Sequence, residues 1–180
     1  MRIIKEQSAG LIIDIQEKLL PHIHGNDALL IRTDILIRGL QILDVPILVT
    51  EQYTKGLGYT VEPVKSLFSE FSSSEKISFS CCDDPGFFEK FKSLSRRFVI
   101  IAGIETHVCV LQTVLDMLEK NYVPVVVSDC VSSRNLQDKE IALRRIEKSG
   151  GIITSTESIL FELTRFAGSD SFKSISRLVK

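Results

Sequence analysis

One stretch of the sequence, residues 97–118, constrains the fold more than any other. It begins with a continuous apolar run, Phe98 to Ala102, that is rich in β-branched residues. Such a run is typical of a strand that is buried on both faces of a parallel sheet. Gly103 ends the run, and apolar residues then recur at helical spacing from Thr106, which stands where an N-cap residue would. The stretch therefore predicts a buried strand, a tight turn and a helix, with Cys109 in the first helical turn.

The same alternation of strand and helix extends over most of the chain. Apolar or extended runs at 8–14, 47–51, 75–80, 98–102, 122–129 and 152–154 are the predicted strands. Helical stripes of apolar residues lie between them, the clearest at 27–44, 106–118, 140–149 and 158–166. About six such alternations predict a three-layer α/β/α domain with a parallel sheet and right-handed crossovers.

Length and composition favour one compact domain. The 180 residues, 44% of them hydrophobic, suit a single unit over residues 1–180 with a core from about 8 to 166. The tail after Gly168 is Ser-rich and basic, and its order stays open. A net charge of −1 argues against a nucleic-acid or membrane-surface partner. No apolar run is long enough to span a membrane and no signal peptide is evident, so we expect a cytoplasmic protein.

The four cysteines form no metal-binding pattern. Cys81 and Cys82 are adjacent, which is not a ligand spacing, and no CxxC or His-rich tract accompanies them. No GxGxxG follows the first predicted strand, so a dinucleotide site is not expected. We therefore expect free thiols, no metal and no cofactor.

Three polar residues, Asp14, Lys76 and Cys109, lie at the ends of three predicted strands or just beyond them. In a parallel sheet these ends meet at one edge, which is where ligands bind. Each residue has another interpretation: a helix N-cap for Asp14, an edge-strand charge for Lys76 and a small core residue for Cys109. Together they supply a base, a cation and a nucleophile, as thiol-based acyl transfer requires. A helix N-terminus and a nearby lysine both favour thiolate, so we expect Cys109 to be activated.

Five motifs, in this order, resemble the isochorismatase-like cysteine hydrolase superfamily, which includes nicotinamidases and N-carbamoylsarcosine amidohydrolases. The motifs are Leu-Ile-Ile-Asp14-Ile-Gln16, Thr-Glu51-Gln52-Tyr53-Thr-Lys-Gly-Leu-Gly, Glu75-Lys76-Ile-Ser-Phe79-Ser, Gly103-Ile-Glu105-Thr106-His107-Val-Cys109-Val and Asp129-Cys-Val-Ser-Ser-Arg134. More narrowly, the sequence is similar to the isochorismatase domain-containing proteins of unassigned substrate.

The resemblance implies a six-stranded sheet in the order 3-2-1-4-5-6 and a triad of Asp14, Lys76 and Cys109. It also implies a cis peptide bond between Ile104 and Glu105, which would aim backbone N–H groups at the substrate oxygen. The N–H groups of Glu105 and Cys109 are then the expected oxyanion donors. A homo-oligomer is expected by the same resemblance.

Departures from the family patterns narrow the expected chemistry. Nicotinamidases have an Asp-x-His metal motif after the second strand, where this sequence has Glu51, Gln52 and Tyr53. Isochorismatases proper, which cleave a vinyl ether, lack the cysteine found here at position 109. A metal-dependent nicotinamidase is therefore disfavoured, and Cys109 indicates amide or related acyl chemistry. Gln52, Tyr53 and Phe79 are candidate walls of the substrate pocket.

The sequence thus predicts a metal-independent cysteine hydrolase that cleaves a C–N bond of a small amide or carbamoyl-like substrate through an acyl-enzyme on Cys109. Two alternatives stay open. One is a non-catalytic interaction protein that keeps the fold as an oligomer. The other is a redox-responsive thiol protein that uses Cys109 with Cys130 or Cys81.

Overall fold

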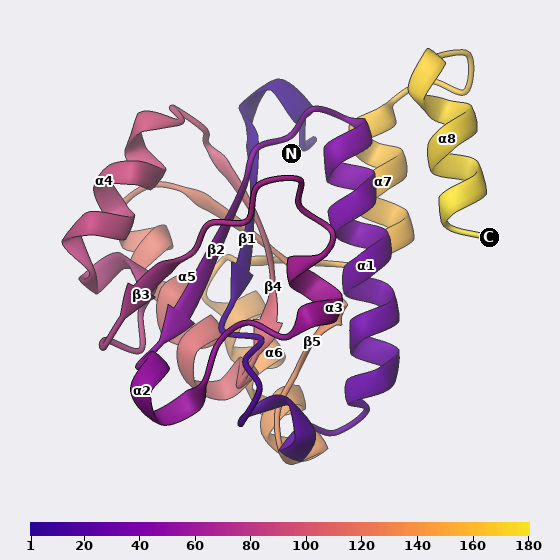
Figure 1. Cartoon of the computed structure of the whole chain (residues 1–180). Helices are drawn as coiled ribbons and strands as arrows, with labels where there is room; N and C mark the ends of the chain where they lie inside the picture. Colours follow the sequence, from indigo (N-terminus) through magenta and orange to yellow (C-terminus); the bar gives the residue numbers. More distant parts are fainter.

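A six-stranded parallel β-sheet forms the centre of the molecule. The computed structural model describes every residue from Met1 to Lys180 (Figure 1). The strands are β1 (Ser8–Ile13), β2 (Ile47–Gln52), β3 (Ser74–Lys76), β4 (Phe98–Ile104), β5 (Val123–Ser132) and β6 (Ile152–Thr154). They lie in the order β3-β2-β1-β4-β5-β6, and every neighbouring pair is parallel. The predicted fold class and strand order are confirmed.

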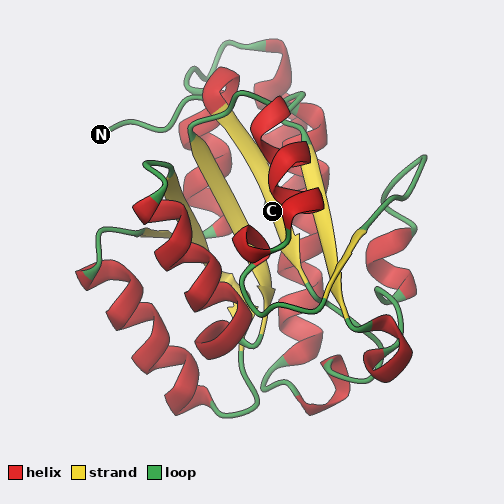
Figure 2. Cartoon of the chain, turned by 90° about the vertical axis from the view of Figure 1, so that its left-hand side faces the viewer, coloured by secondary structure: helices red, strands yellow, loops and turns green.

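Helices cover both faces of this sheet (Figures 1 and 2). They are α1 (Asn26–Ile42), α2 (Thr54–Leu57), α3 (Glu62–Lys65), α4 (Pro85–Ser93), α5 (Leu111–Glu119), α6 (Leu136–Lys148), α7 (Thr156–Thr164) and α8 (Asp170–Leu178). Short 3-10 turns span Lys5–Gln7, Leu20–His22 and Cys81–Asp83, and a π-helical turn spans Thr106–Val110. The helices α1, α7 and α8 pack on one face of the sheet, and α4, α5 and α6 pack on the other.

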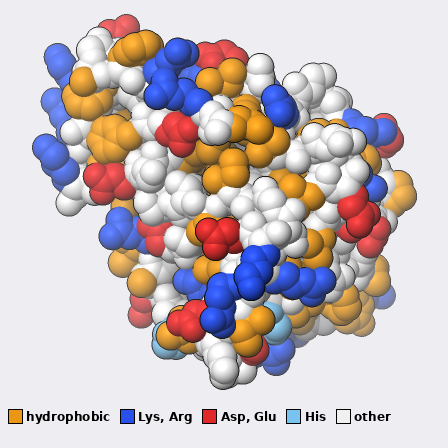
Figure 3. All heavy atoms as spheres, turned by 180° about the vertical axis from the view of Figure 1, so that it is seen from behind, with side chains coloured by type: hydrophobic (Ala, Val, Ile, Leu, Met, Phe, Trp, Pro, Cys, Tyr) orange, Lys and Arg blue, Asp and Glu red, His pale blue; other side chains and the backbone are white.

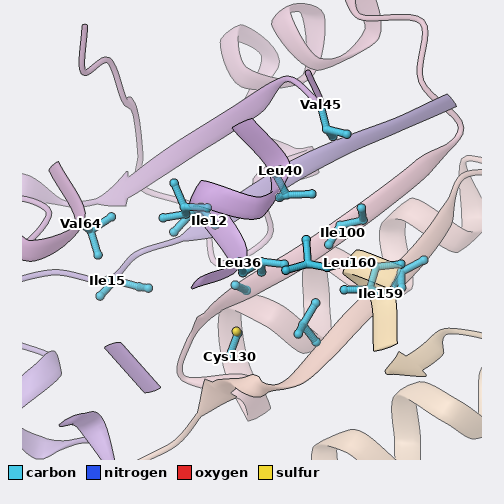
Figure 4. Close-up of a cluster of buried hydrophobic side chains, with 14 of the residues drawn as sticks. Ile12, Ile15, Leu36, Leu40, Val45, Val64, Ile100, Cys130, Ile159 and Leu160 are labelled. Carbon is cyan, nitrogen blue, oxygen red and sulfur yellow. The ribbon is translucent and has the colours of Figure 1, made fainter. Parts of the chain in front are cut away.

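Each face of the sheet has its own apolar core, because successive strand residues point to opposite sides. All six residues of β1 are buried, as its continuous apolar run predicts. On one face, strand residues such as Ile12 and Ile100 pack against Leu36 and Leu40 of α1 and against α7 (Figure 4). On the other face, side chains of β1 and β4 pack against α4 and α5. Full burial of each large side chain contributes roughly 1.5–3 kcal/mol, so the two cores hold the strand ends in fixed positions.

Two segments differ from their predicted form. The third strand is shorter than 75–80, because after Lys76 the chain bends back so that the carbonyl oxygens of Ser78 and Phe79 accept hydrogen bonds from the Lys76 ammonium. The tail, whose order was open, forms α8, and its Ile175 is fully buried in the core shared with α1 and α7. Burial of this apolar residue explains why the polar tail is ordered.

The carboxyl ends of the strands form the lower edge of the sheet in Figure 1. Here Gly103 allows β4 to pass close to the end of β1. Its φ is 153°, and a Cβ atom at this position would lie 2.5 Å from the carbonyl oxygen of Ile13, so only glycine fits. The register between β4 and β5 shifts at the same place. This close approach brings the segment that carries Cys109 against the end of β1.

The surface carries charges of both signs. Figure 3 shows acidic, basic and apolar side chains interspersed on the back of the molecule, with a row of Lys and Arg side chains across its lower half. No helix combines the length and apolar composition that crossing a bilayer requires.

Candidate active site

A buried ion pair joins the ends of β1 and β3. Lys76 Nζ donates to Asp14 Oδ2 at 2.7 Å, and also to the carbonyl oxygens of Ser78 and Phe79 at 3.2 Å each. The Lys76 and Asp14 side chains are 0% and 1% exposed. An ammonium has three donors, and all three are used here. The interpretation of Lys76 as a solvent-exposed edge charge is therefore wrong.

Asp14 lies directly after β1 and faces inward. Its Oδ1 accepts a hydrogen bond from Thr50 Oγ1 at 2.8 Å, while Oδ2 faces Lys76. No backbone N–H donates to this carboxylate, and the next helical turn begins only at Leu20. The N-cap interpretation of Asp14 is wrong. Asp14 is instead a buried, ion-paired carboxylate at the switch point of the sheet, where β1 lies between β2 and β4.

Cys109 lies in the opening turn of a helix, but this turn is π-helical and leads into α5. Glu105, and not Thr106, occupies the N-cap position, and no side chain caps the turn. The Cys109 backbone is tied to the next turn, since Thr113 Oγ1 donates to the Cys109 carbonyl oxygen at 2.7 Å. Single π-helical turns within helices are frequent at functional sites, and this one places the thiol at the carboxyl edge of the sheet.

Gln52 faces the thiol from β2. The Cys109 Sγ atom lies 3.6 Å from Gln52 Oε1, within range of a weak S–H donor. The Gln52 backbone N–H donates to Gln16 Oε1 at 2.7 Å, and its Nε2 donates to the Ile77 carbonyl oxygen at 3.2 Å. These contacts orient the amide so that its oxygen points towards Cys109.

Three adjacent strands end at a non-glycine residue with left-handed backbone: Tyr53 after β2 (φ 38°), Asp14 after β1 (φ 55°) and Glu105 after β4 (φ 55°). This conformation is uncommon outside glycine, and strained residues of this kind cluster at functional sites. The cis peptide bond expected between Ile104 and Glu105 is absent, because every peptide bond in the chain is trans. The left-handed Glu105 and the φ of 153° at Gly103 make the turn instead.

Burial dominates the electrostatics of the thiol. It raises the pKa of Cys109, the Asp14 carboxylate raises that pKa further, and Lys76 opposes both effects. For Lys76, burial disfavours the ammonium, but Asp14, Cys81 and Cys109 outweigh burial and leave its pKa raised. The expectation of an activated thiolate is therefore wrong for the resting site. At rest, a neutral thiol lies beside a carboxylate–ammonium pair.

Cys109 opens onto a cavity of about 740 Å³. Of the three predicted wall residues, Gln52 and Phe79 line this cavity. Tyr53 does not, because its left-handed backbone turns it to a separate hollow beside Glu75, where it is 51% exposed. Sequence reasoning missed five further lining residues. These are Leu19, His22, Val108, Arg134 and Asn135.

One wall of the cavity is built around a buried carboxylate. The Glu105 side chain is 10% exposed, and its Oε1 lies 3.0 Å from Arg134 Nε. On its other side, Glu105 Oε2 lies 3.5 Å from His107 Nε2, and His107 Nδ1 pairs with Ser133 Oγ at 2.9 Å. Arg134 closes the fifth sequence motif, and its place just after β5 was the signal that could have assigned it to this edge.

The arrangement matches one known family. Residues 8–158 match the model of the Isochorismatase domain. The chain belongs to the isochorismatase family. It is 43% identical to isochorismatase family protein 1B of Dictyostelium discoideum, over 99% of this chain and 89% of that protein.

Two solved structures superpose on nearly the whole chain. The MAR1 ribonuclease of Caenorhabditis elegans gives a TM-score of 0.93 with 37% identity, covering 99% of this chain and 92% of that one. The Escherichia coli YcaC gene product, described as an octameric hydrolase of unknown specificity, also gives 0.93, with 22% identity over 99% and 90% of the two chains. The second likeness shows the shared fold alone.

In this isochorismatase-family chain, Glu51 stands where nicotinamidases have the aspartate of their metal motif, and here it has a structural role. Glu51 is 4% exposed, and its two oxygens accept hydrogen bonds from the Thr60 N–H at 2.6 Å and from Ser73 Oγ at 2.9 Å. The carboxylate thereby ties together the two segments that follow β2. No three His, Cys, Asp or Glu side chains come together as a ligand set.

The other three cysteines are buried and free. Burial raises the pKa of Cys81, Cys82 and Cys130 to about 12. Cys130 belongs to the core on the face of α1, and its Sγ pairs with Thr156 Oγ1 at 3.1 Å (Figure 4). Cys109 belongs to the core on the opposite face. The sheet therefore separates Cys109 from Cys130, which excludes that pairing in the folded protein.

Proposed function

We propose that this chain is a metal-independent cysteine hydrolase that cleaves a C–N bond of a small amide or carbamoyl-like substrate through an acyl-enzyme on Cys109. The observation that carries the proposal is the buried Asp14–Lys76 pair, 2.7 Å apart, behind a cysteine that lines a cavity. A buried ion pair adds little net stability, so its presence beside a nucleophile favours a catalytic use. Membership of a family that includes cysteine hydrolases agrees with this reading.

In the proposed reaction, Asp14 takes the thiol proton as Cys109 Sγ attacks the substrate carbonyl carbon. The raised pKa of the thiol means that proton transfer and attack occur together, without a standing thiolate. Lys76 stays charged and offsets the changing charge on Asp14 and sulfur. The N–H groups of Glu105 and Cys109 are the proposed donors to the oxyanion.

The second half of the reaction restores the site. Collapse of the tetrahedral intermediate breaks the C–N bond, and the leaving nitrogen takes the proton from Asp14. Asp14 then removes a proton from water as the water attacks the thioester carbonyl. The C–S bond breaks, sulfur regains a proton, and a carboxylic or carbamic acid leaves. Each step needs only Cys109, Asp14, Lys76, water and the substrate.

A second candidate function comes from the ribonuclease name of the Caenorhabditis elegans structure. The observation that favours an anionic substrate such as RNA is Arg134 in the cavity wall, whose guanidinium is paired with Glu105 only through Nε. The net charge of −1 opposes it, because nucleic-acid binding relies on a basic surface. We infer C–N hydrolysis, and the test below includes RNA as a separate arm. By analogy with the octameric YcaC structure, we also propose that the chain forms a homo-oligomer.

The test is covalent trapping of the intermediate. The protein is mixed with a set of small amides and carbamoyl compounds, quenched in acid within seconds and analysed as tryptic peptides by mass spectrometry. An acyl adduct on the Cys109 peptide that hydroxylamine removes is the expected result. The Asp14→Asn variant should form this adduct much more slowly than the wild-type protein. Release of nucleotides from RNA by wild type and by Cys109→Ala alike, with no adduct from any amide, would overturn the proposal.

A further inference from the structure

Asp14 is held by two side-chain donors, one on each carboxylate oxygen. Lys76 Nζ donates to Oδ2 at 2.7 Å, and Thr50 Oγ1 donates to Oδ1 at 2.8 Å. The reaction described above uses the lysine but gives the threonine no part. Thr50 is fully buried on β2, where its partner in the sheet register is Ile13, the residue before Asp14. Two donors on different oxygens fix the plane of the carboxylate, because rotation about its Cβ–Cγ bond would break both hydrogen bonds.

The neighbours of Thr50 determine the direction of its hydrogen bonds. A hydroxyl carries one proton and an ionised carboxylate only accepts, so this proton lies towards Asp14. The oxygen of Thr50 is then an acceptor for its other neighbour, Cys81 Sγ, which lies 3.8 Å away. The Cys81 thiol is fully buried, and its raised pKa keeps it protonated. A chain of donors therefore runs from Cys81 through Thr50 to the Asp14 carboxylate.

Cys81 is also tied to the helical turn that carries the nucleophile. Its backbone N–H donates to Thr113 Oγ1 at 3.0 Å, and Thr113 Oγ1 donates to the Cys109 carbonyl oxygen at 2.7 Å. Both of these hydrogen bonds are buried, as is the one from Thr50 to Asp14. Behind the cavity, Cys81 thus links the base to the backbone of the nucleophile. Hydrogen bonds are stronger in a buried network than in water, so this one holds the two groups in a fixed relation.

We propose that Thr50 is a positioning residue for Asp14, whose carboxylate its hydroxyl orients and partly neutralises. The inference rests on the proposed function for the role of Asp14 as the base. The charged or titratable side chains that act on the Cys109 thiol are Asp14, Lys76 and Cys81. Because the Asp14 carboxylate raises the pKa of this thiol, loss of the Thr50 donor should strengthen that effect and lower the thiolate fraction. Thr50 thus acts on Cys109 through Asp14, and this action is measurable without turnover.

The test is the rate at which iodoacetamide alkylates Cys109 at pH 8, resolved by peptide mapping. Thr50→Val keeps the shape of the side chain but removes the hydroxyl, so alkylation should slow by at least about threefold, because a hydrogen bond to a charged group is lost. Thr50→Ser keeps the hydroxyl and should stay within about twofold of the wild-type rate. In the Asp14→Asn background, Thr50→Val should change the rate less than about twofold, since the charge through which it acts is absent.

The chain offers a matched control at the core on the other face of the sheet. There Cys130 Sγ pairs with Thr156 Oγ1 at 3.1 Å, and Thr156 Oγ1 donates to Asp129 Oδ1 at 3.0 Å, so the same three residue types recur. Thr156→Val removes an equally buried hydroxyl and should leave the alkylation of Cys109 unchanged. Far-UV circular dichroism checks that each variant is folded. If Thr50→Val does not fold, Thr50→Ala compared with Thr50→Ser measures the loss of the same hydroxyl.

Equal slowing in Thr50→Val and Thr50→Ser would overturn the proposal, because packing and not the hydroxyl would then decide the rate. The same slowing by Thr50→Val in the Asp14→Asn background would overturn it too, and so would an equal change in Thr156→Val. Slowing that depends on Asp14, with no acyl adduct from any amide, would reject the hydrolase and keep the positioning role. A wild-type alkylation rate in Thr50→Val, with acyl adducts on the wild-type protein, would reject the positioning role and keep the hydrolase.

Discussion

Replacement of Lys76 by methionine removes the ammonium but keeps a long apolar stem in the core. The Asp14 carboxylate would remain 1% exposed, with the Thr50 hydroxyl at 2.8 Å as its remaining partner. The carbonyl oxygens of Ser78 and Phe79 would each lose a donor as well. Removing one partner of a buried ion pair costs about 3–5 kcal/mol, because an uncompensated charge stays in the interior. We expect Lys76→Met to lower the free energy of unfolding by that amount.

Two comparisons make this prediction specific. The double variant Asp14→Asn/Lys76→Met should be less destabilised than Lys76→Met alone, because it leaves no unpaired charge. Arg38→Met breaks a surface pair on α1, where the Arg38 and Asp34 side chains are 52% and 39% exposed, and should cost far less than Lys76→Met, because solvent screens this pair. Urea unfolding at pH 7, followed by far-UV circular dichroism, measures these four proteins and the single variant Asp14→Asn, which the additivity comparison requires. A Lys76→Met cost below about 1 kcal/mol, as for a surface pair, would refute the reasoning, and so would strict additivity in the double variant.

Three further outcomes are expected. Stability should fall as the pH rises from 9 towards about 12, because folding raises the pKa values of Lys76, Cys81, Cys82 and Cys130 and so favours their protonated forms. Their contribution to stability is complete only below the unfolded pKa values, which are 9.0 for cysteine and 10.5 for lysine. Denaturant midpoints that do not change over this pH range would contradict the prediction. EDTA dialysis should leave turnover unchanged, since both Glu51 oxygens are engaged by Thr60 and Ser73, whereas a loss reversed by zinc, iron or manganese would reject the metal-independent mechanism. Light scattering should give a multiple of 20.2 kDa, and a monomer at micromolar concentration would exclude the homo-oligomer.

The part of the site that lies on strands could be predicted from the sequence. Continuous apolar runs fix where β1 and β4 end, and a parallel sheet brings those ends together, so Asp14 and Cys109 meet at one edge. Lys76 could be assigned from the resemblance, but its burial depends on the bend that follows it. Local sequence alone left open an exposed edge-strand charge as the alternative.

The loop-borne part of the site could not be predicted. Tyr53 was expected in the cavity, yet its direction depends on a left-handed backbone that no periodicity reveals. The Glu105–Arg134 pair joins the ends of β4 and β5; the position of Arg134 just after β5 could have placed it at this edge, but its pairing with Glu105 depends on side-chain geometry. The thiol's raised pKa has the same origin, because it depends on desolvation that only the packed site produces.

The most direct test of the coupled Asp14, Lys76 and Cys109 site is the rate at which iodoacetamide alkylates Cys109 at pH 8, resolved by peptide mapping. Asp14→Asn should react faster, because the carboxylate that raises the thiol pKa is gone, and Lys76→Met should react slower. Each unit of pKa changes the thiolate fraction about tenfold. Cys130, on the other face of the sheet, should be unaffected in both variants. Rate changes of the same sign, or none, would contradict the account.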